Sequence, residues 1–123
     1  MYLVTGATGF IGSAVVRRLL ARNQAVRVLS RPNSDYANIR SLSVEIFEGD
    51  LLSPESIRDA VKGCEGVFHV AADYRLWTRD PEEMFKVNVE GTRSVIEAAT
   101  EAGVRRVVYT SSVAVLGNPQ PGI

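Results

Sequence analysis

The chain has 123 residues, and its 14 Lys and Arg balance its 14 Asp and Glu, so the formal net charge is zero. This length suits one small domain or part of a larger one, and 46% hydrophobic residues are typical of a globular protein. A neutral chain without a basic run is a poor match for nucleic acid or an anionic membrane. One Cys and one His exclude an intramolecular disulfide and a thiolate–imidazole zinc site.

No apolar stretch approaches the roughly 20 residues that a membrane span needs. A predicted strand begins almost at Met1, which leaves no room for a signal peptide. We therefore expect a soluble, cytoplasmic protein without a membrane span.

The first half of the chain alternates short apolar runs with polar segments. A strand is predicted over residues 2–5, a helix over 13–21 and a second strand over 25–30. The polar segment 31–42 is expected to be a loop, and a third strand follows over residues 44–48.

The second half continues this alternation. A Ser–Pro start predicts a helix over residues 53–62, and the apolar run 66–71 is typical of a strand buried on both faces. A long helix is predicted over 81–102 and a fifth strand over 107–111. Strands that alternate with helices favour a parallel sheet with right-handed crossovers, so we predict a doubly wound α/β fold.

Three glycines at three-residue spacing, Gly6, Gly9 and Gly12, separate the first predicted strand from the first predicted helix. Gly6 allows a sharp turn, Gly9 lets the backbone approach a pyrophosphate, and Gly12 allows close packing of the helix. The helix then offers unpaired N–H groups and its positive dipole end to an anion. We predict a dinucleotide-binding loop here, with a glycine-rich turn that binds nothing as the alternative; its other members are Thr8, Phe10 and Ile11.

The residues after the second strand bear on the choice between NADP and NAD. An NAD site usually has an acid there, whereas this chain has Arg31, and its next acid is Asp35. A guanidinium suits a 2′-phosphate, and Ser30 can add a hydrogen bond. The sequence favours NADP; the alternative is a solvated Arg31 and an NAD site served by Asp35.

Further candidates follow the third and fourth strands. Asp50 can accept a hydrogen bond from an adenine amino group, with Leu51 against the ring, but an acid is equally common in such a turn. Ala71 and Ala72 are predicted to end the fourth strand at the carboxyl edge, where small side chains let a cofactor pass, although alanine is also an ordinary core residue. His69 is expected to be a packed core residue rather than a general base.

Five segments together resemble the extended short-chain dehydrogenase/reductase family of the NAD-dependent epimerase/dehydratase type; they are Thr5–Gly12, Gly49–Leu51, His69–Ala72, Asn88–Thr92 and Tyr109–Ser112. They span nearly the whole chain in the expected order. Within the family, residues 67–77 are most similar to hopanoid-associated sugar epimerases and dihydroflavonol 4-reductase-like proteins. The resemblance implies a Rossmann fold, of which this chain would be the N-terminal five-strand portion.

The resemblance also implies a reaction. In this family, NAD(P) exchanges a hydride with a carbonyl or alcohol carbon of a small-molecule substrate, here expected to be sugar-like or dihydroflavonol-like. A Tyr acts as acid/base with a Lys four residues later, and a Ser or Thr after the fifth strand bonds the substrate oxygen. Ser112 fits that last role, with Ser111 as its neighbour. Asn88 matches a family Asn that braces the backbone beside the cofactor.

No Tyr in this chain has a Lys four residues later, because the two lysines are Lys62 and Lys86 and the residues at that spacing before them are Arg58 and Glu82. We therefore expect residues 1–123 to be an incomplete NAD(P)-binding domain of a longer enzyme, inactive alone. Alternatives are a protein that senses NAD(P) without turnover and a scaffold with an empty groove.

Two surfaces carry further expectations. Family members often dimerise through the long helix, so residues 82–102 are a candidate homodimer surface, on which Phe85, Val89 and Ile96 share one helical face. The segment Asp73–Trp77 is either a substrate-side wall in which Arg75 meets an anion or a loop anchored by a buried Trp77.

Overall fold

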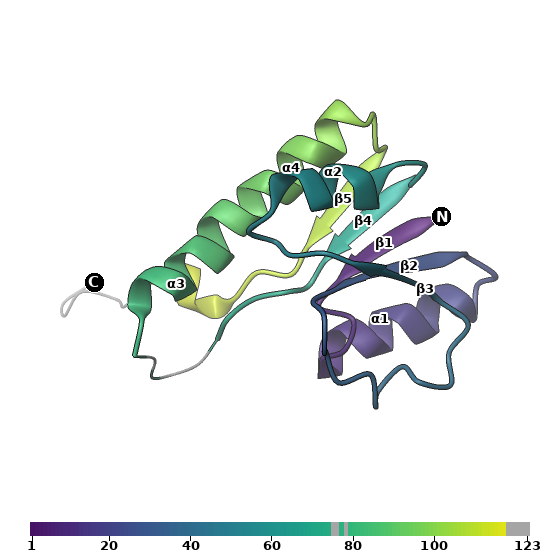
Figure 1. Cartoon of the computed structure of the whole chain (residues 1–123), viewed down its shortest axis with the longest axis horizontal. Helices are drawn as coiled ribbons and strands as arrows, with labels where there is room; N and C mark the ends of the chain where they lie inside the picture. The colour runs from purple at the N-terminus through teal and green to yellow at the C-terminus, as the bar shows by residue number, and fades with distance from the viewer. Residues whose placement is uncertain (75–76, 78, 118–123) are drawn as a thin grey trace.

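The computed structural model describes residues 1–74, 77 and 79–117, in which one parallel sheet is covered by helices on both faces (Figure 1). The strands are β1 (Tyr2–Thr5), β2 (Val26–Ser30), β3 (Glu45–Glu48), β4 (Gly66–His69) and β5 (Arg106–Tyr109). The helices are α1 (Phe10–Leu20), α2 (Pro54–Val61), α3 (Pro81–Phe85) and α4 (Thr92–Glu101), with a π-helical segment η1 (Lys86–Gly91) and a 3₁₀ turn η2 (Val113–Leu116). Within these residues, no helix combines the length and apolar character that a membrane span requires.

The strand order β3-β2-β1-β4-β5 confirms the predicted doubly wound α/β fold. The chain builds outward from β1 to β2 and β3, and then returns past β1 to add β4 and β5. β1 and β4 are therefore parallel neighbours at the point where the direction of winding reverses. In open α/β sheets, ligands bind beyond the carboxyl ends of the strands at such a point.

Side chains on the two faces of the sheet form two separate cores, because successive residues of a strand point to opposite faces. The first core lies under α2 and α4; its buried residues are Leu3, Leu29, Ile57, Ala60, Val61, Val67, Val95, Ala98 and Ala99. The second lies under α1; its buried residues are Val4, Ala7, Val16, Leu19, Val26, Val28 and Ile39. Both cores hold the helices in place, so the strand ends at the carboxyl edge are rigidly positioned.

Several boundaries differ from the sequence prediction. α1 begins at Phe10 rather than at residue 13, so Gly12 lies inside the helix. β4 ends at His69, and the prediction that Ala71 and Ala72 end this strand is wrong, because both follow it. β5 ends at Tyr109, two residues before the predicted end.

β4 ends early because the chain of β1 turns away beside it. The N–H of Val70 still donates to the carbonyl oxygen of Thr5, at 3.3 Å. The next residue after Thr5 is Gly6, whose φ of +69° takes its backbone out of the ladder. The N–H of Ala71 donates to the Thr5 hydroxyl instead, at 3.2 Å. The hydroxyl of Thr5 therefore takes the place of a backbone carbonyl where the pairing of β1 with β4 ends.

The long helix predicted over residues 81–102 is continuous from Pro81 to Glu101, but it contains the π turn η1. The buried residues of α4 are Val95, Ala98 and Ala99. The predicted apolar face is buried in part, since these three residues belong to it, but its members Phe85, Val89 and Ile96 are exposed. In a π turn, hydrogen bonds join residues five apart rather than four apart, so different residues share a face of the helix. A prediction from regular helical spacing does not include this change.

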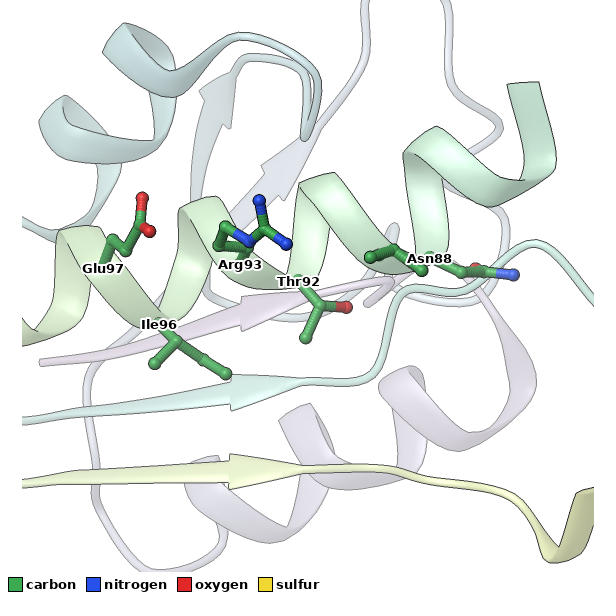
Figure 2. A pocket seen from close by; sticks show the side chains of 6 residues that line it. Asn88, Thr92, Arg93, Ile96 and Glu97 are labelled. Atoms are coloured by element: carbon green, nitrogen blue, oxygen red, sulfur yellow. The ribbon is translucent and has the colours of Figure 1, made fainter. Parts of the chain in front are cut away.

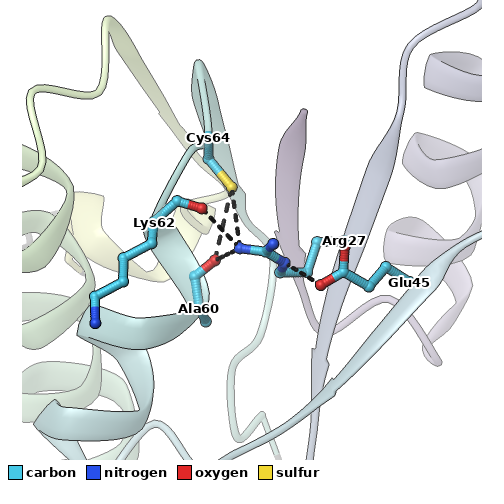
Figure 3. A network of polar contacts seen from close by, with 5 residues as sticks. All are labelled: Arg27, Glu45, Ala60, Lys62 and Cys64. Atoms are coloured by element: carbon cyan, nitrogen blue, oxygen red, sulfur yellow. Dashed lines mark hydrogen bonds and ion pairs between the residues drawn. The ribbon is translucent and has the colours of Figure 1, made fainter.

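One guanidinium joins the elements at the opposite, amino edge of the sheet (Figure 3). Arg27 Nε donates to Glu45 at 2.7 Å, and Arg27 Nη1 donates to the carbonyl oxygens of Ala60 and Lys62 at 2.7 and 2.9 Å. These carbonyls end α2 and lack partners within the helix. The same nitrogen lies 3.9 Å from the sulfur of Cys64, and burial raises the pKa of that thiol.

We predict that Arg27→Met lowers the free energy of unfolding by about 2–3 kcal/mol, because the α2 carbonyls lose a charged donor. Arg58→Met is the matched control. Arg58 forms an exposed ion pair with Glu101 at 3.5 Å, and such pairs contribute well under about 1 kcal/mol. Urea denaturation of both variants measures the difference; equal stabilities would contradict the capping role of Arg27.

Candidate functional site

The turn between β1 and α1 is built from backbone contacts that exclude two side chains. Gly6 has a φ of +69°, and a Cβ on Gly6 would lie 2.6 Å from the backbone nitrogen of Ala71. A Cβ on Gly12 would lie 2.0 Å from the carbonyl oxygen of Gly6. Both distances are far below van der Waals contact, so Gly6 and Gly12 are required by packing within the chain.

Gly9 differs, because the protein leaves room beside it. Gly9 is the N-cap of α1, and its backbone (φ −79°, ψ 176°) is an extended conformation that any residue adopts. A Cβ on Gly9 would approach only the carbonyl oxygen of Gly6, at 3.4 Å. Ser would cap the helix better than Gly does. The absence of a side chain at Gly9 is therefore explained by neither packing nor capping.

The first turn of α1 has the properties of an anion site. The N–H groups of Phe10, Ile11 and Gly12 precede the first intrahelical bond, which runs from Ser13 to Gly9 at 2.9 Å. No side chain caps these groups, and the first turn contains no acidic residue. The positive end of the helix dipole lies at the same place. These donors fit the diphosphate of a dinucleotide, which brings negative charge and several acceptor oxygens.

The loop that follows β2 is fastened to the glycine turn. The amide nitrogen of Asn38 donates to the carbonyl oxygen of Thr8 at 2.7 Å, and Arg17 of α1 donates to the carbonyl oxygen of Asn38 at 2.6 Å. Ile39 is buried under α1. Sequence reasoning missed Asn38 and Arg17, because a contact 30 residues away leaves no periodic signal in a polar loop.

Arg31 follows β2 and is exposed. In the part of the chain that the structure describes, its guanidinium has no hydrogen bond or ion pair. The Ser30 hydroxyl bonds to the hydroxyl of Tyr36 at 2.8 Å, and the Asp35 carboxylate accepts from the N–H of Ala37 at 2.9 Å. Arg31 therefore supplies a free positive charge directly after β2, while the exposed Glu48 of β3 lies opposite Ser30.

Asp50 and Leu51 follow β3 and are both half-buried. One carboxylate oxygen of Asp50 accepts from the N–H of Leu52 at 2.8 Å, as in an ordinary turn. Leu51 packs against the long helix, where a Cβ on Gly91 would lie 3.1 Å from the Cβ of Leu51. The second carboxylate oxygen of Asp50 remains for a ligand.

Ala71 and Ala72 lie in a segment that is held from two sides. Gly6 packs against Ala71, as described above. From the other side, Asn88 of η1 accepts from the N–H of Asp73 at 2.8 Å and donates to the carbonyl oxygen of Asp73 at 2.7 Å. Figure 2 shows Asn88 beside the chain that follows β4. Because π turns occur often at functional sites, this brace draws attention to the segment.

Two expectations concern the segment that follows Ala72. Trp77 is 75% exposed, so the expectation of a loop anchored by a buried Trp77 is wrong. Arg75, which was expected to meet an anion, lies outside the described residues.

His69 is fully buried at the end of β4, as expected for a packed core residue. Its Nδ1 lies 2.7 Å from the Thr5 hydroxyl oxygen, and its Nε2 lies 2.9 Å from the Thr92 hydroxyl oxygen. The ring stacks on Tyr109 with centroids 5.4 Å apart. Burial lowers the pKa of His69 to about 4, so the imidazole is neutral near pH 7.

Ser111 and Ser112 follow β5 beside the end of β4, since the N–H of Thr110 donates to the carbonyl oxygen of His69 at 3.0 Å. Both serines are exposed. The Ser112 hydroxyl oxygen accepts from the N–H of Ala114 at 3.2 Å and caps η2. The hydroxyl hydrogen of Ser112 is not used in this contact, so it can donate to a substrate oxygen.

The strand order arranges the candidate residues along one edge of the sheet. In the order from β3 to β5 they are Asp50 and Leu51, Arg31, Gly6 to Gly12, Ala71 and Ala72, and Ser111 and Ser112. An elongated ligand with a central diphosphate therefore meets backbone donors in the middle and polar side chains towards both ends.

A hollow lies on the surface of the long helix. This open groove has a volume of about 480 Å³ and is lined by Asn88, Val89, Thr92, Arg93, Ile96 and Glu97 (Figure 2). All of these residues belong to η1 and α4, and none belongs to the glycine turn. The groove is therefore a feature of the helix surface.

The fold and the glycine turn define the chain as a Rossmann-like α/β protein. The sequence profile of the NAD dependent epimerase/dehydratase family matches residues 2–123, and the chain belongs to this family.

Individual relatives agree with this assignment. The chain is 44% identical over 116 residues to a putative dihydroflavonol 4-reductase of Synechocystis, covering 94% of this chain and 34% of the relative. It is 50% identical over 119 residues to sterol demethylase protein B of Methylococcus capsulatus, covering 96% of this chain and 36% of the relative. A short-chain dehydrogenase/reductase superfamily protein of Agrobacterium tumefaciens, solved with bound NAD, has a TM-score of 0.84 at 36% identity, covering 100% of this chain and 36% of that chain. The chain thus spans about a third of the length of the proteins it matches.

We predict opposite outcomes for matched substitutions at two of the glycines. Gly12→Ser should lower the free energy of unfolding by about 3 kcal/mol or more, because its Cβ meets the Gly6 carbonyl. Gly9→Ser should leave stability within about 1 kcal/mol of wild type or raise it, because a serine caps α1 without strain. Chemical denaturation measures both values. A large loss of stability in Gly9→Ser would show that packing, and not a ligand, requires this glycine.

We predict that acid destabilises the protein through His69. Its pKa is about 4 when folded and 6.5 when exposed, so between these values the unfolded chain binds the proton more readily. The stability that comes from keeping His69 neutral is fully present above pH 6.5. It is lost as the pH falls towards 4, and the total loss in the free energy of unfolding is about 3 kcal/mol. His69 is the single histidine of the chain. In His69→Gln, the free energy of unfolding should therefore depend less steeply on pH between 4 and 6.5. An unchanged slope in His69→Gln would contradict the assignment.

Proposed function

We propose that residues 1–123 are the NAD(P)-binding domain, without its last strands and substrate domain, of an NADP-dependent oxidoreductase or epimerase of the extended short-chain dehydrogenase type. The reaction is hydride transfer to or from a carbonyl or alcohol carbon of a sugar-like or dihydroflavonol-like substrate. The observation that carries the proposal is the first turn of α1, whose N–H groups are left uncapped beside Gly9. Family membership supports it.

The cofactor's nicotinamide supplies the hydride acceptor or donor when it is bound. The residues of this chain would bind and orient it. We assign the diphosphate to the turn of Gly6, Thr8, Gly9, Phe10, Ile11 and Gly12. We assign the adenosine to Asp50 and Leu51, beside Arg31. The remaining contacts fall to Ala71, Ala72 and Ser111, with Asn88 holding the backbone at Asp73.

NADP is favoured over NAD by the charges beside β2. Arg31 is exposed without an ion pair in the described part of the chain, whereas the carboxylate of Asp35 is engaged with Ala37. A free guanidinium suits a 2′-phosphate, and Arg31 directly follows β2, whereas Asp35 lies several residues into the loop. NAD is the alternative, since the Agrobacterium relative was solved with NAD.

For catalysis, we assign to Ser112 the donation of a hydrogen bond to the substrate oxygen. The 123 residues contain no Tyr with a Lys four residues later. We therefore propose that this acid/base pair lies in a further part of the complete gene product. This also makes a non-catalytic NAD(P) sensor the second candidate, and a complete gene without the pair would favour it.

Two further elements belong to the proposal. A homodimer through residues 82–102 is supported by the exposed apolar side chains of Phe85, Val89 and Ile96 on this helix. A cytoplasmic location is supported by the proposed cofactor, because nicotinamide dinucleotides are intracellular metabolites.

We predict that Arg31→Asp reverses the cofactor preference of the protein expressed from its complete gene. The affinity for NADPH should fall about tenfold to a hundredfold, because a charged donor is lost and a like charge faces the 2′-phosphate. The affinity for NADH should be equal or higher. Gly9→Ser is the control that should weaken both.

Fluorescence titration with NADPH and NADH measures these affinities. Equal loss of both cofactors in Arg31→Asp would argue against the 2′-phosphate contact. Absence of binding to either cofactor in the wild type would overturn the proposed function.

A further inference from the structure

His69 connects the start of the glycine turn to the long helix. On one side, its Nδ1 bonds to the hydroxyl of Thr5, the last residue of β1. That same hydroxyl accepts from the N–H of Ala71 and so ends the ladder between β1 and β4. On the other side, its Nε2 bonds to the hydroxyl of Thr92, the first residue of α4. This side chain of β4 thus joins β1 to α4 beside the proposed diphosphate position.

Each polar atom in the link from Thr5 through His69 to Thr92 has a hydrogen-bond partner. A neutral imidazole donates from one nitrogen and accepts at the other, and a hydroxyl can do either, so each tautomer satisfies both contacts. In the described residues, no buried side-chain nitrogen or oxygen lacks a partner. A buried imidazole without such partners is costly compared with an apolar side chain, so the two hydrogen bonds account for a His at this position.

Thr92 lies four residues after Asn88, on the same stretch of helix (Figure 2). Asn88 binds the backbone of Asp73 directly, and Thr92 reaches the end of β4 through His69. The long helix is therefore attached at two points, to the last residue of β4 and to the chain after it. The segment after β4 also contacts Gly6, because a Cβ on Gly6 would lie 2.6 Å from the backbone nitrogen of Ala71.

We propose that His69 is a positioning residue for the dinucleotide, which sets the spacing between the glycine turn and residues 70–73 by joining Thr5 to Thr92. This inference rests on the proposed function. A shift of β4 relative to β1 would change the contact between Gly6 and Ala71. This contact lies next to the N–H groups to which we assign the diphosphate. The imidazole fixes this spacing before the cofactor arrives, so less ordering is needed on binding.

Thr92→Val tests the proposal with little change of shape, because it removes only the hydroxyl that bonds to His69. In the protein expressed from its complete gene, we expect the dissociation constant for NADPH to rise about threefold to tenfold. Thr100→Val is the matched control on the same helix, because the Thr100 hydroxyl bonds only to the carbonyl oxygen of Ile96, at 2.8 Å. Thr100→Val should leave the dissociation constant unchanged.

A second arm separates positioning from general packing. If Thr92 acts on the cofactor through His69, Thr92→Val should have no further effect on NADPH affinity in a His69→Phe background. Independent structural effects would instead add. In an active preparation, the cofactor KM should rise in Thr92→Val while kcat at saturating cofactor stays within about twofold. Thermal melting checks that each variant is folded.

The outcomes separate the two hypotheses. Wild-type binding with an unchanged dissociation constant in Thr92→Val overturns the positioning role alone, and so do additive effects of Thr92→Val and His69→Phe. If His69→Phe does not fold, the comparison of Thr92→Val with Thr100→Val still decides. If the wild type binds neither NADPH nor NADH, the proposed function fails together with the role of His69.

Discussion

The carbonyl oxygen of Gly6 occupies the place where a side chain on Gly12 would begin, and the site depends on this backbone contact. It allows α1 to start at Phe10, only five residues after β1 ends. The helix therefore begins directly at the carboxyl edge of the central strand. Its N–H groups and its dipole point to the place where β1 and β4 diverge. A longer connection would place the same donors away from the strand ends.

Around this centre, the sheet spreads the remaining candidates by strand order. The proposed phosphate donors lie at the middle strand, Arg31 and Asp50 lie towards β3, and Ser112 lies towards β5. This part of the protein is common to relatives with different names, since a dihydroflavonol 4-reductase-like protein and a sterol demethylase protein match it at 44% and 50% identity. Similarity over these residues therefore defines the family and not one substrate.

Local patterns predicted the strand–helix alternation, the cap of α2 and the glycine turn, because each depends on neighbouring residues. The Ser53 hydroxyl, for instance, caps α2 as its position before Pro54 indicates. The element boundaries that were predicted wrongly depend on contacts between residues that are not neighbours in the sequence. The start of α1 depends on Gly12 packing against Gly6, and the end of β4 depends on the Thr5 hydroxyl. The links from Asn38 to Thr8 and from His69 to Thr92 join residues that are 30 and 23 positions apart, and no periodicity records them.

The π turn in the long helix has a consequence for the way this segment can evolve. Removing one residue between Asn88 and Thr92 would replace the π turn by ordinary helical pitch, and it would shorten the spacing between these two anchors from four residues to three. Asn88 and Thr92 would then no longer reach Asp73 and His69 together. A point change at Asn88 would remove one anchor, whereas a change of length in η1 would disturb both. The number of residues in this turn is therefore under tighter constraint than most of their identities.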